Sequence, residues 1–593
     1  MIDMNNDGNP LENERTGISR KEFLQLALVV LVFTSIIFLM TSLRYMSFLD
    51  LNWDLGINMQ MLWTTTHGYL LYETADRQTS GVMSFLQVNS AYIAIPIAYI
   101  YNILPNAFTL LFIQAFVIST SVIPLFYYSV LVTSDEKKSL LISIVFVAGF
   151  AVMSGIFYDF HWEAFLPVEF FTFIYFTSRR RMTGSFLVLL LGSLTLEVFP
   201  FMAGSFLLYR LFVNENLAES YQPLKDRIRR KYPYLLLFVV AGFIYFLIAI
   251  VDGAIVPSFV GQTSSSTHSA IHSVSYLINF GVSGSTIFDS LEYWLLLFTS
   301  LGFVPFLKPK TLVILGPWIY WSVVAYPLYT TQFGVQYGII AMALLMVPFT
   351  HGVATLSQRE KNGVHPFRFP LLLGPISLII FALAFETTSI YINHIHIIFL
   401  SCIFLILGLT TAILYKYDLF DKNNASLLRK KIAPVGTVTY FLVLIIVVGI
   451  VLGPLNPINT TPPGTGGYSI SYEPSPSFSS MRQLTGFIGP NDTVLSTDNL
   501  FPFVANNPNA YSFFWYPTVY SHNPFFPYTN SDLPRFLLLD TSEMFTVPSN
   551  FQNYAFNTTT YGLRMEIVNQ NYPGNIYLFE KGYSGQKILV EAK

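Results

Sequence analysis

Long apolar stretches separated by short polar loops recur along the first 453 residues of the chain. A helix of about 20 apolar residues crosses a bilayer, so each stretch of this length is a candidate membrane span. The predicted single spans are residues 22–43, 107–132, 139–157, 163–178, 233–251, 290–307, 311–326, 338–356, 369–387, 394–415 and 434–453. A further stretch, 183–213, begins and ends beside basic residues and therefore predicts a hairpin that crosses the membrane and returns.

Basic residues mark one side of this bundle, because short loops rich in Lys and Arg stay in the cytoplasm. With about 13 crossings, all the basic clusters fall on the side of the N-terminus. These clusters lie near Arg15, Lys137, Arg179, Lys225, Lys308, Arg359 and Lys416. The polar run 84–104 is not counted, since one more crossing would move Lys137 to the outside. We expect this run to be a helix that lies in the outer interface or dips into the membrane without crossing it.

Composition agrees with a membrane protein. Of the 593 residues, 53% are hydrophobic and only 11% are charged, whereas soluble domains carry about 25% charged residues. A single Cys excludes a disulfide framework and a Cys-based zinc module. A net charge of −2 gives no support for a nucleic-acid partner. The chain is therefore predicted to be a polytopic α-helical protein of the plasma membrane, embedded in the lipid bilayer with its N-terminus in the cytoplasm.

The composition changes after residue 453, where Pro, Gly, Ser and Thr dominate. Short β-rich runs follow, such as DTVLST, RFLLLD and NIYLFEK, and predict a small extracellular α/β domain. The predicted divisions are a cytoplasmic tail (1–21), a transmembrane domain (22–453) with its first outer loop at 44–106, a linker (454–480) and the extracellular domain (481–593).

Polar residues gather in the loops on the predicted outer face, and ionisable groups near a membrane are costly and therefore informative. Asp54 follows the first span, and Leu55 and Ile57 would hold its carboxylate at the interface. The alternative for such an Asp is a solvated loop residue. Glu197, at the apex of the apolar hairpin, is costly without a partner. Other outer-face candidates are Gln60, His67, Gln332, Gln336 and Tyr337.

Asp159, His161 and Glu163 alternate along one outer loop, so in an extended chain all three point to one face. Such a set can bind a divalent cation, Mg²⁺ or Mn²⁺, or position a phosphate through it. A hydrogen-bonded loop end is the equally acceptable alternative. Transfer of a sugar from a lipid phosphate requires a base for the acceptor and a cation or basic group for the leaving phosphate, both at the membrane surface. The absence of a P-loop and of H-E-x-x-H leaves an ATP-driven pump or a zinc protease without support.

Several segments resemble one family of prokaryotic membrane proteins, domain of unknown function 2079 (DUF2079). They are WDLGINMQMLWTTTHG, YDFHWEAFLP, LEVFP and, in the tail, IGPNDTVLSTDNLFPFVANNPNAYSFFWYP. The resemblance implies a relation to the GT-C glycosyltransferases, which use polyprenyl-phosphate sugars, and makes Asp54 the counterpart of their first-loop catalytic acid. The chain departs from the family at Asn89, where a His is usual, and at Leu196 and Val198, where Lys and Asp are common.

The resulting hypothesis is an archaeal or bacterial glycosyltransferase-like protein with a GT-C-like bundle of about 13 helices. It would move a sugar from a polyprenyl-phosphate donor to an extracellular acceptor, with Asp54 and Glu197 as catalytic residues. Asp159, His161 and Glu163 would hold the cation. The expected substrate-binding residues are Gln60, His67, Gln332, Gln336 and Tyr337. The alternatives are a transporter or flippase for a lipid-linked or small polar solute, and a non-catalytic envelope protein.

Overall fold

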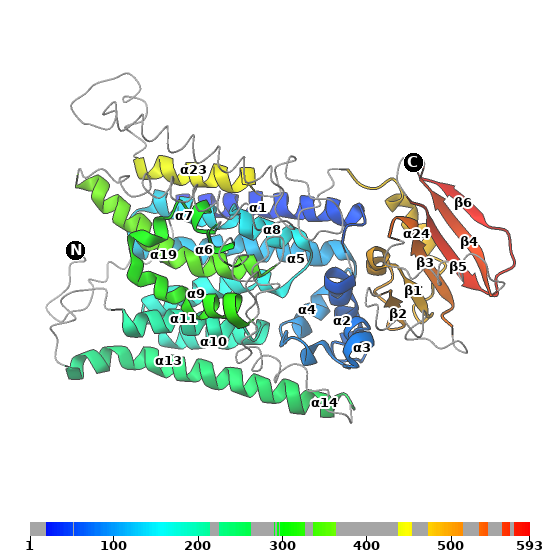
Figure 1. Ribbon diagram of the computed structural model, residues 1–593, viewed down its shortest axis with the longest axis horizontal. Helices are drawn as coiled ribbons and strands as arrows, with labels where there is room; N and C mark the ends of the chain where they lie inside the picture. Colours follow the sequence, from blue (N-terminus) through cyan, green and yellow to red (C-terminus); the bar gives the residue numbers. More distant parts are fainter. Residues whose placement is uncertain are drawn as a thin grey trace, which may run out of the picture.

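The computed structural model describes residues 19–50, 52–213, 224–261, 290, 293–295, 297–325, 336–362, 437–452, 473–513, 533–543, 560–569 and 574–592. A long helical bundle occupies one part of the molecule, and a small β-sheet domain lies beyond one end of it (Figure 1). Short helices of the first outer loop lie between the two. The predicted spans 369–387 and 394–415 lie outside the described residues.

Five helical stretches in the described part are long and apolar enough to cross a membrane. They are Arg20–Met46, Ala107–Thr133, Glu136–Phe157, Arg229–Phe259 and Tyr337–Lys361. Two shorter apolar helices, α10 (Met182–Thr195) and α11 (Phe199–Phe212), form the hairpin predicted for 183–213. The structure therefore confirms a helical bundle of this kind, whereas the total of about 13 crossings stays a prediction.

Successive helices of the bundle pack side by side, with α1 against α5, α6 against α7, α9 against α10 and α11 against α13. A capping box starts α1, in which the backbone N–H of Glu22 donates to Ser19 Oγ and that of Ser19 donates to the Glu22 carboxylate. The bundle helices are α1 (Arg20–Met46), α5 (Ala107–Thr120), α6 (Val122–Thr133), α7 (Glu136–Val147), α8 (Phe150–Tyr158), α9 (Leu166–Ser178), α10, α11, α13 (Leu224–Ile250), α14 (Val256–Phe259), α17 (Gly316–Tyr320), α19 (Tyr337–Lys361) and α23 (Thr437–Leu452).

Two predicted spans, 290–307 and 311–326, are only partly α-helical where the structure describes them: residues 290, 293–295 and 297–300 are α-helical, and the irregular part follows. The chain turns at Gly302 and Phe303, which both have positive φ angles (58° and 56°). It then continues through η5 (Val304–Leu307), η6 (Pro309–Leu315), α17 and the π-helical η7 (Trp321–Ala325). Prolines in these segments remove backbone donors and disfavour a continuous α-helix. The described residues of this region are therefore helical without forming continuous α-helices, and the two crossings stay predictions.

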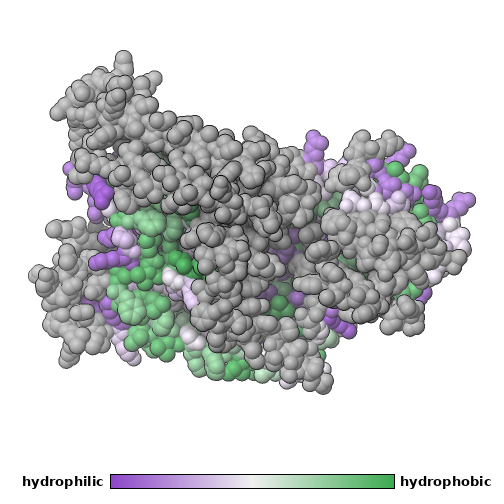
Figure 2. Space-filling model, in the orientation of Figure 1, coloured by the Kyte–Doolittle hydropathy of each residue, from purple (hydrophilic) through white to green (hydrophobic). Residues whose placement is uncertain are grey.

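The surface of the bundle has the polarity expected for contact with lipid. Large apolar side chains are exposed along α1 and α13, including Leu31 at 64% and Phe243 at 63%, and such contiguous apolar surface marks an interaction site. Figure 2 shows hydrophobic residues over the bundle and hydrophilic ones at the end far from the β-sheet. At that far end, Lys138 of α7 pairs with Glu360 of α19 at 3.2 Å.

The first outer loop folds into short helices beside the near end of the bundle (Figure 1). They are the π-helical turn η1 (Asn52–Gly56), α2 (Ile57–Thr65), α3 (Ala75–Ser80), the 3₁₀ turn η2 (Phe85–Gln87) and α4 (Ala94–Tyr101). With eight residues, α4 is too short to cross a membrane, in agreement with the prediction for 84–104. The backbone N–H of Ile93 donates to the Leu194 carbonyl of α10 at 2.9 Å and ties the loop to the hairpin.

The described residues of the tail form a six-stranded sheet with the order β2-β1-β3-β5-β4-β6. Strands β2, β1 and β3 are parallel neighbours, β5 is antiparallel to β3 and β4, and β6 is parallel to β4. Strands β1, β3 and β5 confirm the three predicted runs. The elements are α24 (Phe478–Thr485), β1 (Val494–Ser496), η9 (Asp498–Phe503), β2 (Ala510–Ser512), β3 (Phe536–Asp540), η10 (Thr541–Glu543), β4 (Tyr561–Val568), β5 (Ile576–Lys581) and β6 (Ile588–Glu591).

The tail packs directly on the end of α1. The backbone N–H of Ser475 donates to the Met46 carbonyl at 3.0 Å, and Ser47 Oγ donates to the Glu473 carbonyl at 2.9 Å. Residues 473–480, which we predicted to belong to the linker, are therefore part of this contact.

Candidate functional site

Asp54 lies in the π-helical turn η1, just beyond the end of α1. A π-helical turn is a local irregularity that is frequent at functional sites. The Asn58 side chain donates to the Asp54 carbonyl at 2.6 Å, and Trp162 Nε1 donates to Asn58 Oδ1 at 2.7 Å. His161 Nδ1 lies 3.5 Å from Asp54 Oδ1. The turn that carries Asp54 is thus held against the loop between α8 and α9.

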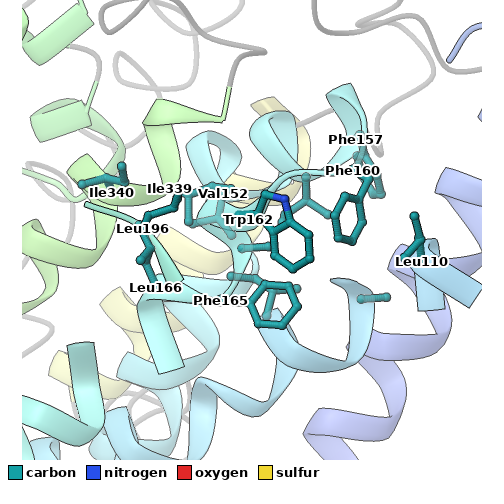
Figure 3. Close-up of a cluster of buried hydrophobic side chains, with 14 of the residues drawn as sticks. Leu110, Val152, Phe157, Phe160, Trp162, Phe165, Leu166, Leu196, Ile339 and Ile340 are labelled. Carbon is teal, nitrogen blue, oxygen red and sulfur yellow. The ribbon is translucent and has the colours of Figure 1, made fainter. Parts of the chain in front are cut away.

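The α8–α9 loop alternates polar and apolar residues, as its sequence predicts. Phe160 and Trp162 are buried with their rings edge to face, 5.1 Å between centroids, and Figure 3 shows both in the apolar cluster beneath the loop. Gln114 of α5 fixes this loop, because its Nε2 donates to the Asp159 carbonyl at 2.9 Å and its Oε1 accepts from His161 N–H at 2.6 Å. The backbone is extended at Asp159 and His161, and a 3₁₀ turn, η3 (Trp162–Ala164), begins immediately afterwards.

Glu197 lies between α10 and α11, at the apex predicted for it, and it has a partner. The backbone N–H of Ser90 donates to Glu197 Oε2 at 2.9 Å. The Ser90 hydroxyl donates in turn to Asp252, and the Tyr92 hydroxyl donates to the other oxygen of the same carboxylate. Asp252 belongs to η4 (Val251–Ile255), a second π-helical turn at the end of α13. Ser90 therefore links the two carboxylates.

The ionisable residues of this region fall into two groups that differ in how far their side chains are exposed to solvent. Asp54, with 18% of its side chain exposed, Glu163, Glu197 and Asp498 of η9 are partly exposed. Behind them Asp159 and Asp252, each 2% exposed, and His161, at 6%, are buried. We refer to the four partly exposed residues as the acidic face. Its members come from the first loop, the α8–α9 loop, the hairpin apex and the C-terminal domain.

The acidic face is one electrostatic unit. Burial raises the pKa of Asp54 well above its ordinary value, and the charges of Asp159, Glu163 and Asp498 raise it further, whereas Arg44 lowers it. Burial also raises the pKa of Glu163 to about 7, with a contribution from Glu197; hydrogen bonds from its own backbone N–H and the Gln336 side chain oppose this shift. Like charges in close proximity disfavour simultaneous ionisation, so the carboxyl groups of the acidic face do not all ionise together.

Arg44 and His161 supply little free positive charge. Arg44 Nε donates to Asp50 Oδ1 at 2.8 Å, and both side chains are buried. Burial, followed by the charge of Arg44, lowers the pKa of His161 to about 3, so its imidazole is neutral at physiological pH. His161 therefore lies beside the Asp54 carboxyl as a neutral ring and does not act as its counter-ion.

The residues expected to hold a cation do not converge on one point. Among the described residues, no three His, Cys, Asp or Glu side chains are arranged to hold a metal ion. The 3₁₀ turn at Trp162 ends the extended alternation of Asp159, His161 and Glu163, and a metal site formed by these three residues stays a prediction. The divalent cation itself stays a prediction.

The other predicted site residues are distributed as follows. Gln336 hydrogen-bonds Glu163, and Tyr337 begins α19 beside it. His67 is away from the acidic face, beyond the far end of α2, exposed and stacked on Trp63 at 3.7 Å between ring centroids. Gln332 lies outside the described residues.

Gln60, a predicted substrate-binding residue, is fully buried, and its side-chain amide bonds other parts of the protein. Its Nε2 donates to the carbonyls of Asn507 and Ala510 at 2.7 and 3.1 Å, and its Oε1 accepts from the backbone and hydroxyl of Thr74. The amide nitrogen of Gln60 therefore joins the first loop to the C-terminal domain, and its amide oxygen holds Thr74 within the loop, so the whole side-chain amide is hydrogen-bonded.

Four residues of the site were not found by sequence reasoning. Asp252 has a detectable signal, since it is a lone acid at the end of an apolar run. Ser90, Tyr92 and Asp498 have none, because they are ordinary loop residues until the fold brings distant segments together.

The chain was compared with known protein families, curated proteins and solved structures. Its sequence matches the family described as "Predicted membrane protein (DUF2079)" over residues 44–427 and 363–532, which include the whole acidic face. No curated protein matches the chain. Among solved structures, the chain matches the crystal structure of ArnT from Cupriavidus metallidurans bound to undecaprenyl phosphate. It has 10% sequence identity and a TM-score of 0.47, and the match covers 95% of this chain and 98% of that chain.

Proposed function

We propose that this chain, which belongs to the DUF2079 family of predicted membrane proteins, is a GT-C-like glycosyltransferase that takes a sugar from a polyprenyl-phosphate carrier. The donor belongs to the same chemical class as the undecaprenyl phosphate in the ArnT structure. The acceptor is a hydroxyl-bearing molecule outside the cell.

The acidic face is the observation that carries this proposal. Four partly exposed carboxyl groups from four distant segments meet at one end of an apolar bundle. Burial of carboxyl groups is costly, and strongly perturbed acids that converge in one place are characteristic of functional sites. A lipid phosphate has its head group at the end of such a bundle, so donor and carboxyls would meet without the sugar entering the membrane.

Asp54 is the proposed general base. Its carboxylate takes the proton from the acceptor hydroxyl as the acceptor oxygen bonds to the anomeric carbon of the sugar. The bond between that carbon and the phosphate oxygen breaks, and the electron pair leaves with the polyprenyl phosphate. Neutral His161, 3.5 Å away, keeps the Asp54 carboxyl oriented during this step.

The leaving phosphate needs stabilisation in a site rich in acids. Glu163, with a pKa raised to about 7 by burial and by the neighbouring Glu197, is available as a protonated donor to a phosphate oxygen. Glu197, held by Ser90, is its proposed partner at the phosphate end. We propose no step through a metal ion, because the described residues do not form a metal site.

The orientation of the protein follows from its basic residues. Arg20, Lys138 and Lys361 lie at the helix ends far from the β-sheet domain. Basic loops are retained in the cytoplasm. We therefore propose that the acidic face and the C-terminal domain are extracellular and that the N-terminus is cytoplasmic.

The test is incubation of the purified full chain in lipid nanodiscs with a panel of polyprenyl-phosphate sugars, with and without Mg²⁺ or Mn²⁺. Mass spectrometry would follow the release of free polyprenyl phosphate. We expect one donor to be consumed faster than in protein-free nanodiscs. If no donor in the panel is consumed by folded protein, the proposal fails. The metal arms separately test the predicted cation.

A further inference from the structure

The C-terminal domain contains three parallel strands, β2, β1 and β3, and the turn η9 that follows β1 contacts η1, which carries Asp54. Strand β1 lies between β2 and β3. The chain therefore runs from β1 to β2 on one side and then crosses to β3 on the other side of β1. Ligands in open α/β sheets bind outside the carboxyl ends of the strands at such a change of direction. Here the residues at this place are Asp498 and Asn499, which follow β1, and Asp540, which ends β3.

The polar groups at this edge include an atom that has no hydrogen-bond partner. Asn499 Nδ2 donates to Asp540 Oδ2 at 2.8 Å. Asn499 Oδ1 accepts no hydrogen bond in the described structure although the residue is only 2% exposed. Asp498 Oδ1 accepts from the Ser512 hydroxyl at 3.1 Å, and the residue remains partly exposed. Carboxylate and amide oxygens are hydrogen-bond acceptors, so this edge suits a ligand that presents hydroxyl groups.

A set of hydrogen bonds fixes this edge in front of Asp54. The segment η9, which begins with Asp498, contacts η1, which contains Asp54. Side chains of the first outer loop also donate hydrogen bonds to the segment around β2. These bonds fix the distance between η9 and η1. The bonds are Gln60 to the Asn507 and Ala510 carbonyls, Thr74 to the Ala510 carbonyl at 2.7 Å, Gln78 to the Ser512 carbonyl at 3.3 Å and Tyr101 to Asn506 at 2.8 Å.

We infer that the C-terminal domain binds the acceptor, a hydroxyl-bearing glycoside, at the carboxyl ends of β1 and β3, with Asp498 accepting a hydrogen bond from one of its hydroxyls opposite Asp54. This inference rests on the proposed function. The lipid donor reaches the acidic face from the bundle, where Glu163 and Glu197 lie. The acceptor must then approach from the side of the sheet, and Asp498 is the acidic-face residue which that domain supplies.

Steady-state kinetics with methyl α-mannoside, methyl α-glucoside and methyl β-galactoside as probe acceptors test the inference. In Asp498→Asn, the KM for the glycoside is expected to rise about tenfold, because the glycoside hydroxyl then donates to a neutral amide oxygen and no longer to a charged carboxylate. Ser512→Ala removes the hydroxyl that donates to Asp498 and should raise this KM by less. The KM for the lipid donor should change much less. Glu591→Gln, at the exposed edge strand β6, is the matched control. Equal changes in both KM values, or none, would overturn the inference.

A second arm does not depend on transfer. The full chain is treated with a water-soluble carbodiimide and glycinamide, and labelling of each carboxyl is followed by mass spectrometry with and without the methyl glycosides. We expect a glycoside to slow the labelling of Asp498 but not of Glu591. Protection without transfer by any donor would support this site and reject the proposed function. Transfer without protection of Asp498 would do the reverse.

Discussion

Two acidic groups near the same end of the molecule look alike in charge and differ in construction. Glu73 and Asp76 lie in one turn of the first outer loop, where the Glu73 carboxylate accepts the backbone N–H of Asp76 at 2.9 Å. Both residues are buried, at 1% and 8% exposure. Burial raises the pKa of Glu73, and the charge of Asp76 raises it further; burial raises that of Asp76 to about 6. The acidic face also has raised pKa values, but its residues come from four distant segments.

The difference shows which features identify a site. The Glu73–Asp76 pair is a local cap at the start of α3, closed to solvent and three residues apart. The acidic face is partly exposed, and Gln114, Ser90 and Asn58 hydrogen-bond the segments that carry it. Elevated pKa values occur in both, so they do not separate structure from function. The two groups are instead distinguished by the convergence of distant segments and by partial exposure, which only the acidic face has.

The largest expected contrast is between Asp54→Asn and Asp76→Asn, which each replace one acid by its near-isosteric amide. We expect Asp54→Asn to lower the transfer rate by about 10²–10⁴-fold, the contribution of a general base. Asp76→Asn leaves the acidic face intact and should change the rate little. Rates of polyprenyl-phosphate release from both variants check this. Similar rates for the two would erase the distinction between the groups.

A smaller loss is expected when the support of Glu197 is removed. Asp252→Asn and Ser90→Ala leave the Glu197 carboxyl in place but weaken its link to α13. Misplacement of a catalytic group by about 1 Å costs up to about 10²-fold in rate. We therefore expect Asp252→Asn and Ser90→Ala to lower the transfer rate, as we expect of Glu197→Gln. The transfer rate at saturating donor is the measurement. Full activity of all three variants would remove Glu197 from the mechanism.

The pH profile tests the role of Glu163. Its pKa, raised to about 7, means that the carboxyl is protonated and can donate a hydrogen bond below this pH, and is ionised above it. Transfer should therefore decrease as the pH rises through about 7. Glu163→Gln keeps an N–H donor at every pH, so its alkaline decrease should be weaker than that of the parent. An unchanged alkaline limb would show that another group controls it.

The smallest effect on transfer and a clear effect on stability are expected at the contact with the C-terminal domain. Gln60→Leu leaves the Asn507 carbonyl and the Thr74 N–H without their buried partner. Each unsatisfied buried group costs about 1–3 kcal/mol, so thermal unfolding should occur at a lower temperature. His67→Ala, at an exposed position of the same loop, is the control. Equal unfolding temperatures would contradict a structural role for Gln60.

Local patterns in the sequence predict much of this architecture. The apolar run of α1, the hairpin of α10 and α11 and the strands β1, β3 and β5 follow from residues that are neighbours in the chain. Asp54 and Glu197 are visible for the same reason, as acids beside apolar runs. The links from Asp252 to Ser90 and from η9 to η1 join residues 162 or more positions apart. No local pattern encodes such contacts, so they appear only with the fold.

The irregular segment from Gly302 to Ala325 shows that local patterns can also fail within a single segment. Its hydropathy is that of a membrane span, but its prolines and left-handed turn set the backbone conformation. Hydropathy therefore identifies the environment of a segment and does not determine its secondary structure.

The position of a bound donor phosphate tests the central claim most directly. It can be measured by cryo-electron microscopy of the full chain in nanodiscs with a non-hydrolysable polyprenyl-phosphate sugar. We predict a phosphate within hydrogen-bonding distance of Glu163 or Glu197, with the sugar directed towards Asp54 and Asp498. A phosphate in the middle of the bundle, between α7 and α19, would contradict the account and favour transport.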